Sequence, residues 1–271
     1  MPVLNILVAF NGSASSISAL KYAAALAHKD RAYVTAILAH TSHEVIDRKH
    51  RWIPAQAAAL IANANDEVIE KIEAKFVELS SELELGDRLL FRKTTGRVDD
   101  LLAQTARSFD ILIVGQHLDD DDEHITLHPD RIALISGRPV VVVPTDFSLS
   151  GTHSHVAVAW DGGRAAARAV SDSLRILEDE GKVSLLTVRG ASNPPVDDLL
   201  QHLSRHGTDA IHHDLPRVTS IGDALVNFCK RQDATLLVMG AYEHSKFRED
   251  FLGGVTATVL REIKIPVLLS H

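Results

Sequence analysis

The strongest constraint on the fold is that the chain carries one pattern of residues twice. The first copy contains NILVAFNGSASSISALKYAAALA and the second HVAVAWDGGRAAARAVSDSLRIL, each an apolar run, a turn with Asn-Gly or Asp-Gly, and an alanine-rich helical pattern. Asn11 and Asp161 correspond at a distance of 150 residues, whereas Gly115 and Gly240 correspond at 125. The first copy is therefore longer in its middle by roughly two dozen residues, and helical periodicity places this excess between residues 54 and 85.

Each copy alternates apolar runs with helical patterns, which is typical of a sheet whose strands are connected by helices. The fourth and fifth runs of both copies are continuously apolar, as expected for parallel strands that helices cover on both faces. We predict an α/β fold of two repeated, doubly wound, mainly parallel five-stranded sheets with helices on both faces. The expected strands lie near residues 4–10, 32–39, 88–93, 110–115, 139–144, 155–160, 182–188, 210–214, 234–239 and 266–270.

The two copies predict two domains, residues 1–146 and 153–271. The polar segment TDFSLSGTHS, residues 145–154, is the expected linker between them. Doubly wound sheets bind ligands beyond the carboxyl ends of their strands, at the point where the strand order reverses. The residues that matter for function should therefore follow the first and fourth strands of each copy.

A long polar loop follows the fourth strand of the second copy. It begins at Gly240 and ends at Gly253 and Gly254, which lead into the helical pattern VTATVLREI. Paired glycines let backbone N–H groups point outward together, and the helix adds unsatisfied N–H groups and the positive end of its dipole. With the hydroxyl of Thr256 and the charge of Lys246, this corner is suited to a phosphate. Two glycines alone are more simply explained as a turn that enters a helix.

Together with the turn AWDGGRAAARAV, this loop resembles the nucleotide-binding pattern of the universal stress protein family. That family has a five-stranded doubly wound α/β fold, and its nucleotide-binding members carry G-x2-G-x9-G, followed by Ser or Thr, after the fourth strand. Gly240, Gly253 and Gly254 fit this spacing, and Asp161 stands where the family has an aspartate on the adenine side. The resemblance covers both halves, so the chain resembles a tandem universal stress protein.

The resemblance implies that the second domain binds ATP or another adenine nucleotide, with Asp161 near the base and the glycine corner around ribose and phosphates. Val188, at the end of the second strand, is a candidate for the adenine pocket, although a core valine has the same signature. His244 is a candidate donor to a phosphate or ribose, or a residue that holds the loop together. The candidate binding residues are Asp161, Val188, Gly240, His244, Gly253, Gly254, Val255 and Thr256.

Two positions depart from the family's pattern. Gly254 replaces Ser or Thr but keeps its N–H group, and Glu243 replaces the second glycine. If the Glu243 carboxylate points into the site, its repulsion of one phosphate charge at ~4 Å costs on the order of 4 kcal/mol at an effective dielectric of about 20. The side chain can instead turn outward, pair with Lys246, or help to hold a divalent cation such as Mg²⁺ beside the phosphates.

The first copy lacks the glycine corner. Its corresponding loop carries five consecutive acids, residues 119–123, which would repel a triphosphate, and Asn11 replaces the aspartate after the first strand. Gly12 and Ser13 remain, which indicates the turn itself. We predict a degenerate first domain that keeps the fold without the phosphate site. The acidic run is more simply a solvated loop than a cation site, because it lacks the ligand spacing of a calcium loop.

Several other residues have simpler structural explanations. Trp160 can flank a base by stacking, but a strand-end residue that packs on a helix has the same signature. The histidine pairs 153/155 and 212/213 lack cysteine partners or HExxH spacing, which argues against zinc. Cys229, the single cysteine, lies in a helical pattern and is expected to be a buried thiol.

Composition limits the function classes. The net charge of −8 argues against a general nucleic-acid binder, and the 45% hydrophobic fraction supports real cores. The N-terminal run starts directly with an expected strand without the features of a signal peptide, and no apolar run approaches the ~18 residues of a membrane span. These features predict a cytoplasmic protein that does not bind membranes.

We therefore expect a regulatory or protective stress-response protein that binds an adenine nucleotide. The chain has no P-loop and no G-x-S-x-G motif, and we assign no catalytic or metal-binding residue. Two alternatives stay open: a nucleotide-free module that binds proteins, and a slow ATP hydrolase. The expected partners are the nucleotide and unidentified proteins. The tandem is expected to imitate a family dimer in which the fifth strands of the two halves meet, and a further homodimer stays open.

Overall fold

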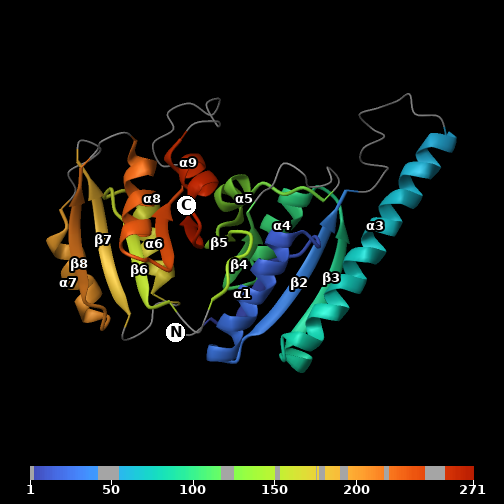
Figure 1. Cartoon of the computed structure of the whole chain (residues 1–271), viewed down its shortest axis with the longest axis horizontal. Coiled ribbons are helices and arrows are strands. Elements are labelled where there is room, and N and C mark those ends of the chain that lie inside the picture. The colour runs from blue at the N-terminus through green and yellow to red at the C-terminus, as the bar shows by residue number, and fades with distance from the viewer. Residues whose placement is uncertain are drawn as a thin grey trace.

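The structure is a computed structural model in which one sheet runs through the whole chain (Figure 1). It describes residues 3–41, 55–116, 125–149, 153–174, 176, 181–189, 195–216, 220–241 and 254–271, and the side chains of residues 55–63 are not part of the description. The first half, with strands β1 to β5, lies on the right of Figure 1, and the second half, with β6 to β10, lies on the left.

Both halves alternate strands and helices as the sequence predicts. The first half contains β1 (Asn5–Ala9), α1 (Ala14–Asp30), β2 (Tyr33–His40), α3 (Ala55–Glu82), a 3-10 turn (Gly86–Arg88), β3 (Leu89–Thr95), α4 (Val98–Ala106), β4 (Ile111–Gly115), α5 (Pro129–Ser136) and β5 (Val140–Val143). The second half contains β6 (His155–Ala159), α6 (Arg164–Ser173), β7 (Lys182–Val188), α7 (Asp197–Arg205), β8 (Ala210–Leu215), α8 (Ile221–Arg231), β9 (Leu236–Gly240), α9 (Val255–Glu262) and β10 (Val267–Ser270). Every strand predicted from the sequence is confirmed, with ends that differ by at most two residues.

The two five-stranded sheets are halves of one ten-stranded sheet. Among the described residues its strand order is β3-β2-β1-β4-β5-β10-β9-β6-β7-β8. All neighbouring strands are parallel except β5 and β10, which pair antiparallel with Leu268 opposite Val141. The fifth strands therefore meet as predicted, and the repeat unit is the doubly wound order 3-2-1-4-5 on each side of that pair.

Helices cover both faces of the sheet, and strand residues alternate between two cores. On β1, Ile6 and Val8 face one core, whereas Leu7 and Ala9 face the other. The first core is completed by α1, α3, α6 and α7, and the second by α4, α5, α8 and α9. This burial on both sides explains why the strands are continuously apolar rather than alternating.

The extra length of the first half lies in α3, as predicted. This helix has 28 residues, whereas its counterpart α7 has 9. Its buried side chains recur at three- and four-residue steps, which presents one stripe to the core. They are Ile69, Ile72, Phe76, Leu79 and Leu83, the last just beyond the helix end.

Side-chain contacts reinforce the joint between the halves. The Gln116 side chain donates to the backbone oxygen of Leu260 at 2.6 Å, and Arg168 donates to the oxygen of Gly137 at 3.2 Å. The hydroxyl of Tyr22, on α1, lies 2.7 Å from Nε2 of His153, the residue two positions before β6. Polar groups from both halves are thus bonded to one another along the β5–β10 pair.

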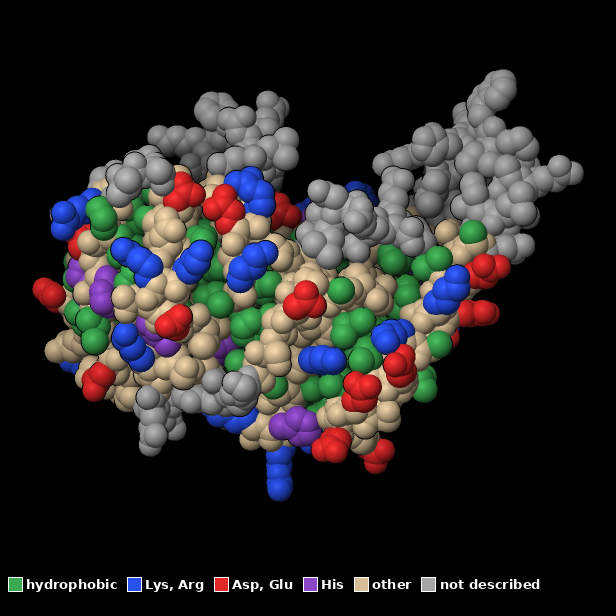
Figure 2. Space-filling model, in the orientation of Figure 1, with side chains coloured by type: hydrophobic (Ala, Val, Ile, Leu, Met, Phe, Trp, Pro, Cys, Tyr) green, Lys and Arg blue, Asp and Glu red, His purple; other side chains and the backbone are tan. Residues whose placement is uncertain are grey.

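Figure 2 shows Lys and Arg side chains interspersed with Asp and Glu over the visible face, without a continuous basic surface there. None of the helices in the described ranges combines the length and the apolar character that a membrane span requires.

Candidate functional site

The strand order reverses beside β6 in the second half. Strand β6 lies between β7 and β9, with Val158 opposite Val238, so the carboxyl ends of β6 and β9 reach the same edge of the sheet. Asp161 follows β6 at this edge and Gly240 ends β9. The structure therefore brings the residues after the first and fourth strands together, as the sequence predicts.

Asp161 holds the turn that links β6 to α6. Its Oδ1 atom accepts a hydrogen bond from the N–H group of Gly163 at 2.8 Å, and Gly162 has a φ of +80°. Asn11 makes the equivalent bond, because its Oδ1 accepts from the N–H group of Ser13 at 3.1 Å. An Asx side chain is thus needed by the turn in both halves, whether or not a ligand is present. The difference is exposure, since Asn11 is buried and Asp161 is only half-buried.

Gly240 has a packing role. A Cβ atom at this position would lie 2.6 Å from the backbone N of Ala166 and 2.7 Å from the backbone C of Ala165, in the first turn of α6. Gly115 meets the first turn of α1 in the same way, with the backbone C of Ser15 at 2.6 Å. Because the first half keeps this glycine although its loop lacks the glycine corner, Gly240 by itself does not distinguish a nucleotide site from a packing contact.

The start of α9 lies after the candidate loop. Gly254 is the N-cap of this helix, with extended backbone at φ −75° and ψ 170° and no side-chain cap. A Cβ atom on Gly254 would meet nothing within 4 Å. Val255 begins the helix and is half-buried, whereas Thr256 is buried. The first N–H groups of the helix therefore lie beside space that a ligand can approach.

The remaining candidates divide between the core and the undescribed segments. Val188 is buried and belongs to the same apolar cluster as Leu215, its partner on β8. Gly253 and His244 lie outside the described residues, together with Glu243, Lys246 and the acidic run 119–123.

Polar residues on β7 and β8 were not singled out as binding residues from the sequence. Nε of Arg189 donates to Oδ2 of Asp214 at 2.6 Å, and the Oγ1 atom of Thr187 lies 2.9 Å from Nε2 of His212. The signal was present in the polar residues of the edge strand AIHHDL, whose two histidines were considered only as zinc ligands. In the described part of the chain, no group of three or more His, Cys, Asp or Glu residues is arranged to hold a metal ion.

Cys229 is a structural thiol, as predicted. Its side chain is buried against the second core, and burial raises the pKa of the thiol to about 12. The reactive thiolate is therefore scarce at neutral pH.

Comparison with known proteins shows which family the second half resembles and which solved structures share the fold. Residues 152–271 match the model of the universal stress protein family. The chain is 27% identical over 187 residues to the universal stress protein Slr1230 of Synechocystis, a match that covers 64% of this chain and 62% of that relative. The second half is therefore similar to the universal stress protein family, and both halves of the chain have the same order of strands.

Solved structures that superpose over nearly the whole chain confirm the fold. A universal stress protein from Archaeoglobus fulgidus superposes with a TM-score of 0.74 at 16% identity, covering 98% of this chain and 95% of that one. A protein of unknown function from Pseudomonas aeruginosa superposes with a TM-score of 0.54 at 15% identity, covering 99% and 92%. At these identities the likeness concerns the fold alone.

Proposed function

We propose that the second half binds an adenine nucleotide at the carboxyl ends of β6 and β9 and acts as a ligand-dependent regulatory protein. The observation that carries this proposal is the uncapped start of α9, where Gly254 leaves open space beside the N–H groups of the helix. Helix N-termini of this kind bind phosphates. The match of residues 152–271 to the family model and the position of the Asp161 turn at the same edge support the same ligand.

Within this proposal, phosphates bind at Gly254 and Val255 and the base lies toward Asp161. Gly253 and His244 are proposed as further phosphate-binding residues, and Mg²⁺ as the counter-ion of the phosphates. The site offers binding and orientation rather than a general base, so ligand occupancy, and not turnover, is the expected signal. The cytoplasm, where ATP is abundant, is the proposed location.

The first half is proposed to be structural, so that one chain binds one nucleotide. Its switch point is covered by α3, because a Cβ atom on Gly12 would lie 3.0 Å from Cγ1 of Ile72. Asn11 is buried beside it at 7% exposure. In the second half the turn at Asp161 is half-buried, and the counterpart of α3 on this side of the sheet is the short helix α7.

Replacement of Gly254 by aspartate is expected to abolish ATP binding while leaving the fold intact. Gly254 has an ordinary φ and free space, and aspartate is a favourable N-cap residue, so the helix should be stabilised rather than lost. The same carboxylate would occupy the phosphate position and repel it. Titration calorimetry with ATP and Mg²⁺ measures the loss, and circular dichroism checks the fold.

Gly254→Ser is the matched variant, because it also caps the helix but adds a hydroxyl instead of a charge, and it should keep the wild-type affinity or improve it. Replacing Asp119 to Asp122 with asparagine should leave both the affinity and the stoichiometry of one unchanged. Equal affinity in Gly254→Asp would contradict the site. Absence of any heat with the wild-type chain would favour the nucleotide-free interaction module, and steady phosphate release from ATP would favour the slow hydrolase.

A further inference from the structure

Phe10 and Trp160 occupy the same position in the two halves. Each follows the first strand of its half, 150 residues apart in the sequence. The N–H group of Phe10 donates to the oxygen of Ile37 at 3.0 Å, and that of Trp160 donates to the oxygen of Leu186 at 2.8 Å. Since these acceptors lie at matching positions of β2 and β7, the two aromatic residues are structurally equivalent.

In the first half, α3 covers the aromatic ring. Phe10 is 1% exposed, and its ring packs edge to face against Phe76 of α3, with centroids 5.9 Å apart at 72°. Phe76 in turn stacks on Phe91 of β3 at 4.6 Å. The three rings form a continuous aromatic cluster over the switch point, together with Ile72 above Gly12.

In the second half nothing equivalent to Phe76 is present among the described residues. Helix α7 buries only Leu199 and Leu203, and no described aromatic ring contacts Trp160. The Trp160 side chain remains half-buried, and its Nε1 atom donates to the oxygen of Pro195 at 3.4 Å. This bond uses the edge of the indole, and the side chain also packs in part against the first core.

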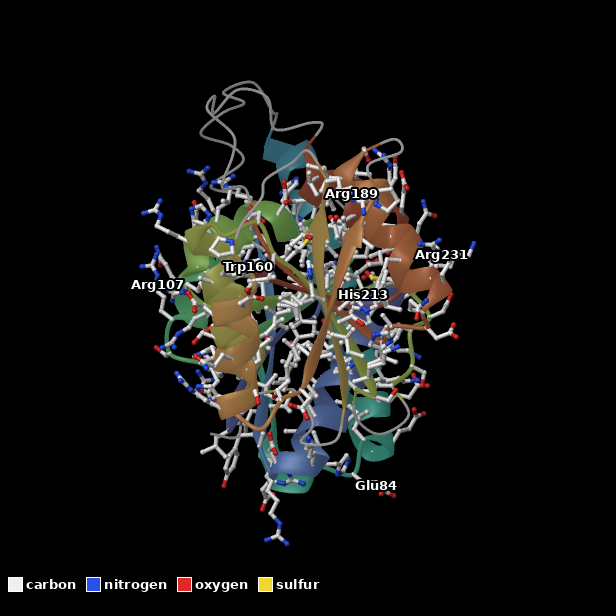
Figure 3. All side chains as sticks on the ribbon, turned by 90° about the vertical axis from the view of Figure 1, so that its left-hand side faces the viewer. Glu84, Arg107, Trp160, Arg189, His213 and Arg231 are labelled. Carbon is white, nitrogen blue, oxygen red and sulfur yellow. The ribbon has the colours of Figure 1, made fainter. Side chains whose placement is uncertain are left out.

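Two neighbouring strand positions are apolar in the first half, where the long helix α3 covers them, and polar in the second half, which has the shorter helix α7. Thr187 stands at the position of Leu38 and His212 at that of Phe91, by the registers of β2–β3 and β7–β8. These two residues bond to each other, and Arg189 bonds to Asp214 beside them. Figure 3 shows Trp160 and Arg189 at one end of the second half. Hydrogen-bonding side chains at the ends of these strands suit a polar ligand better than a packed apolar helix.

We propose that the indole of Trp160 stacks on the base of the nucleotide, in the place that Phe76 takes against Phe10 in the first half. The inference rests on the proposed function and adds a binding residue to it. Trp160 directly precedes Asp161, whose turn lies at the edge of the sheet. The indole lies on the face of the first core and α9 on the face of the second, so the nucleotide would cross this edge at Asp161 to reach Gly254. In the first half the protein's own α3 fills this place.

Tryptophan fluorescence tests the stacking directly, because the chain has two tryptophans and Trp160 can be isolated by Trp52→Phe. Titration of this variant with ATP and Mg²⁺ should quench the fluorescence saturably, at the midpoint that calorimetry gives. Inorganic tripolyphosphate, which has no base, should bind without quenching.

Trp160→Ala should weaken ATP binding roughly 10-fold or more, which is typical when a stacking ring is removed from a nucleobase. Trp160→Phe should restore most of the affinity, and Trp52→Phe should leave it unchanged. ATP heat without quenching, together with an unchanged affinity in Trp160→Ala, would overturn the stacking and leave the proposed function standing. No ATP heat in any variant would overturn both.

Discussion

Replacement of Gly240 by alanine is expected to destabilise the protein by about 3 kcal/mol, the upper range for overpacking a tightly packed contact. The added methyl would lie 2.6 Å from the N atom of Ala166, 2.7 Å from the C atom of Ala165 and 2.9 Å from its Cβ. Two of these atoms are backbone, so a change of side-chain rotamer cannot relieve the contact. The first turn of α6 must instead move away from β9, and the Asp161 turn moves with it. Chemical denaturation followed by circular dichroism measures the loss.

Gly254→Ala is the matched control for this effect. Its methyl would enter open space from an extended backbone, so the variant should lose less than about 1 kcal/mol through the weaker N-cap. Gly115→Ala should behave like Gly240→Ala, because its methyl would meet the backbone of Ser15 and Ser16 at 2.6 and 2.7 Å. A Gly240→Ala variant as stable as the control would show that the helix and strand are less tightly packed than the structure has them.

The arrangement of strands could be predicted because it depends on local patterns. Runs such as the one ending at Gly115 are too short for a helix and apolar on both faces, which leaves a buried parallel strand. The repeat then fixed the second half once the first was assigned. The meeting of β5 and β10 was expected instead from the resemblance, because the tandem was expected to imitate a family dimer.

The roles of individual site residues could not be derived from the sequence, because they depend on contacts between distant elements. Gly240 fits a phosphate motif, yet Gly115 in the half without that motif makes the same contact with a helix. Asp161 and Asn11 likewise share one turn-forming bond. The covering of Phe10 by α3 is not visible in sequence, because helical periodicity does not say which strand a helix crosses.

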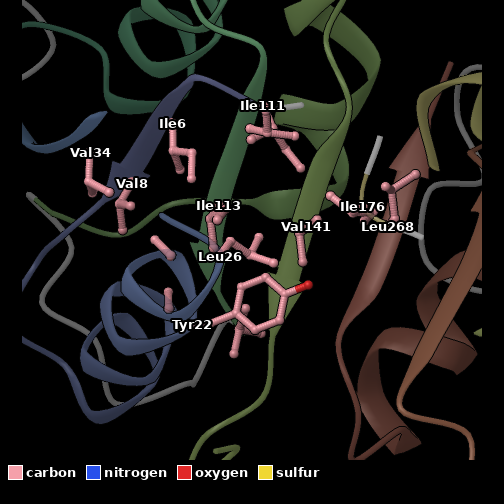
Figure 4. Packing of buried hydrophobic residues seen from close by; sticks show 14 of the residues in the cluster. Ile6, Val8, Tyr22, Leu26, Val34, Ile111, Ile113, Val141, Ile176 and Leu268 are labelled. Atoms are coloured by element: carbon pink, nitrogen blue, oxygen red, sulfur yellow. The ribbon is translucent and has the colours of Figure 1, made fainter. Parts of the chain in front are cut away.

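A buried histidine at the joint couples the stability of the protein to pH. Figure 4 shows Tyr22 among the buried apolar residues of the first core, and its hydroxyl bonds to Nε2 of His153. Burial raises the pKa of Tyr22 well above its usual range, so the hydroxyl stays protonated in this hydrogen bond. His153 is fully buried, and its Nδ1 atom has no hydrogen-bond partner among the described residues. Burial lowers the pKa of His153 from 6.5 to about 4, against an opposing effect of the Thr235 backbone and with a further lowering by Lys29.

We expect the protein to lose about 3 kcal/mol of stability through His153 as the pH falls from 7 to 4. Between pH 6.5 and 4 the unfolded chain binds a proton on this residue that the folded chain does not, so the stabilisation is complete above pH 6.5 and disappears toward pH 4. Burial also lowers the pKa values of His155 and His213, which adds to the effect with the same sign.

Denaturant unfolding across this range should show a shallower pH dependence for His153→Gln, which keeps an acceptor for Tyr22 but cannot titrate. Tyr22→Phe, which removes the hydroxyl and leaves the histidine, should keep the pH dependence while losing about 1 kcal/mol at pH 7. If the free energy of unfolding of the wild type and of His153→Gln fell equally with pH, protonation of His153 would not be the cause of the loss.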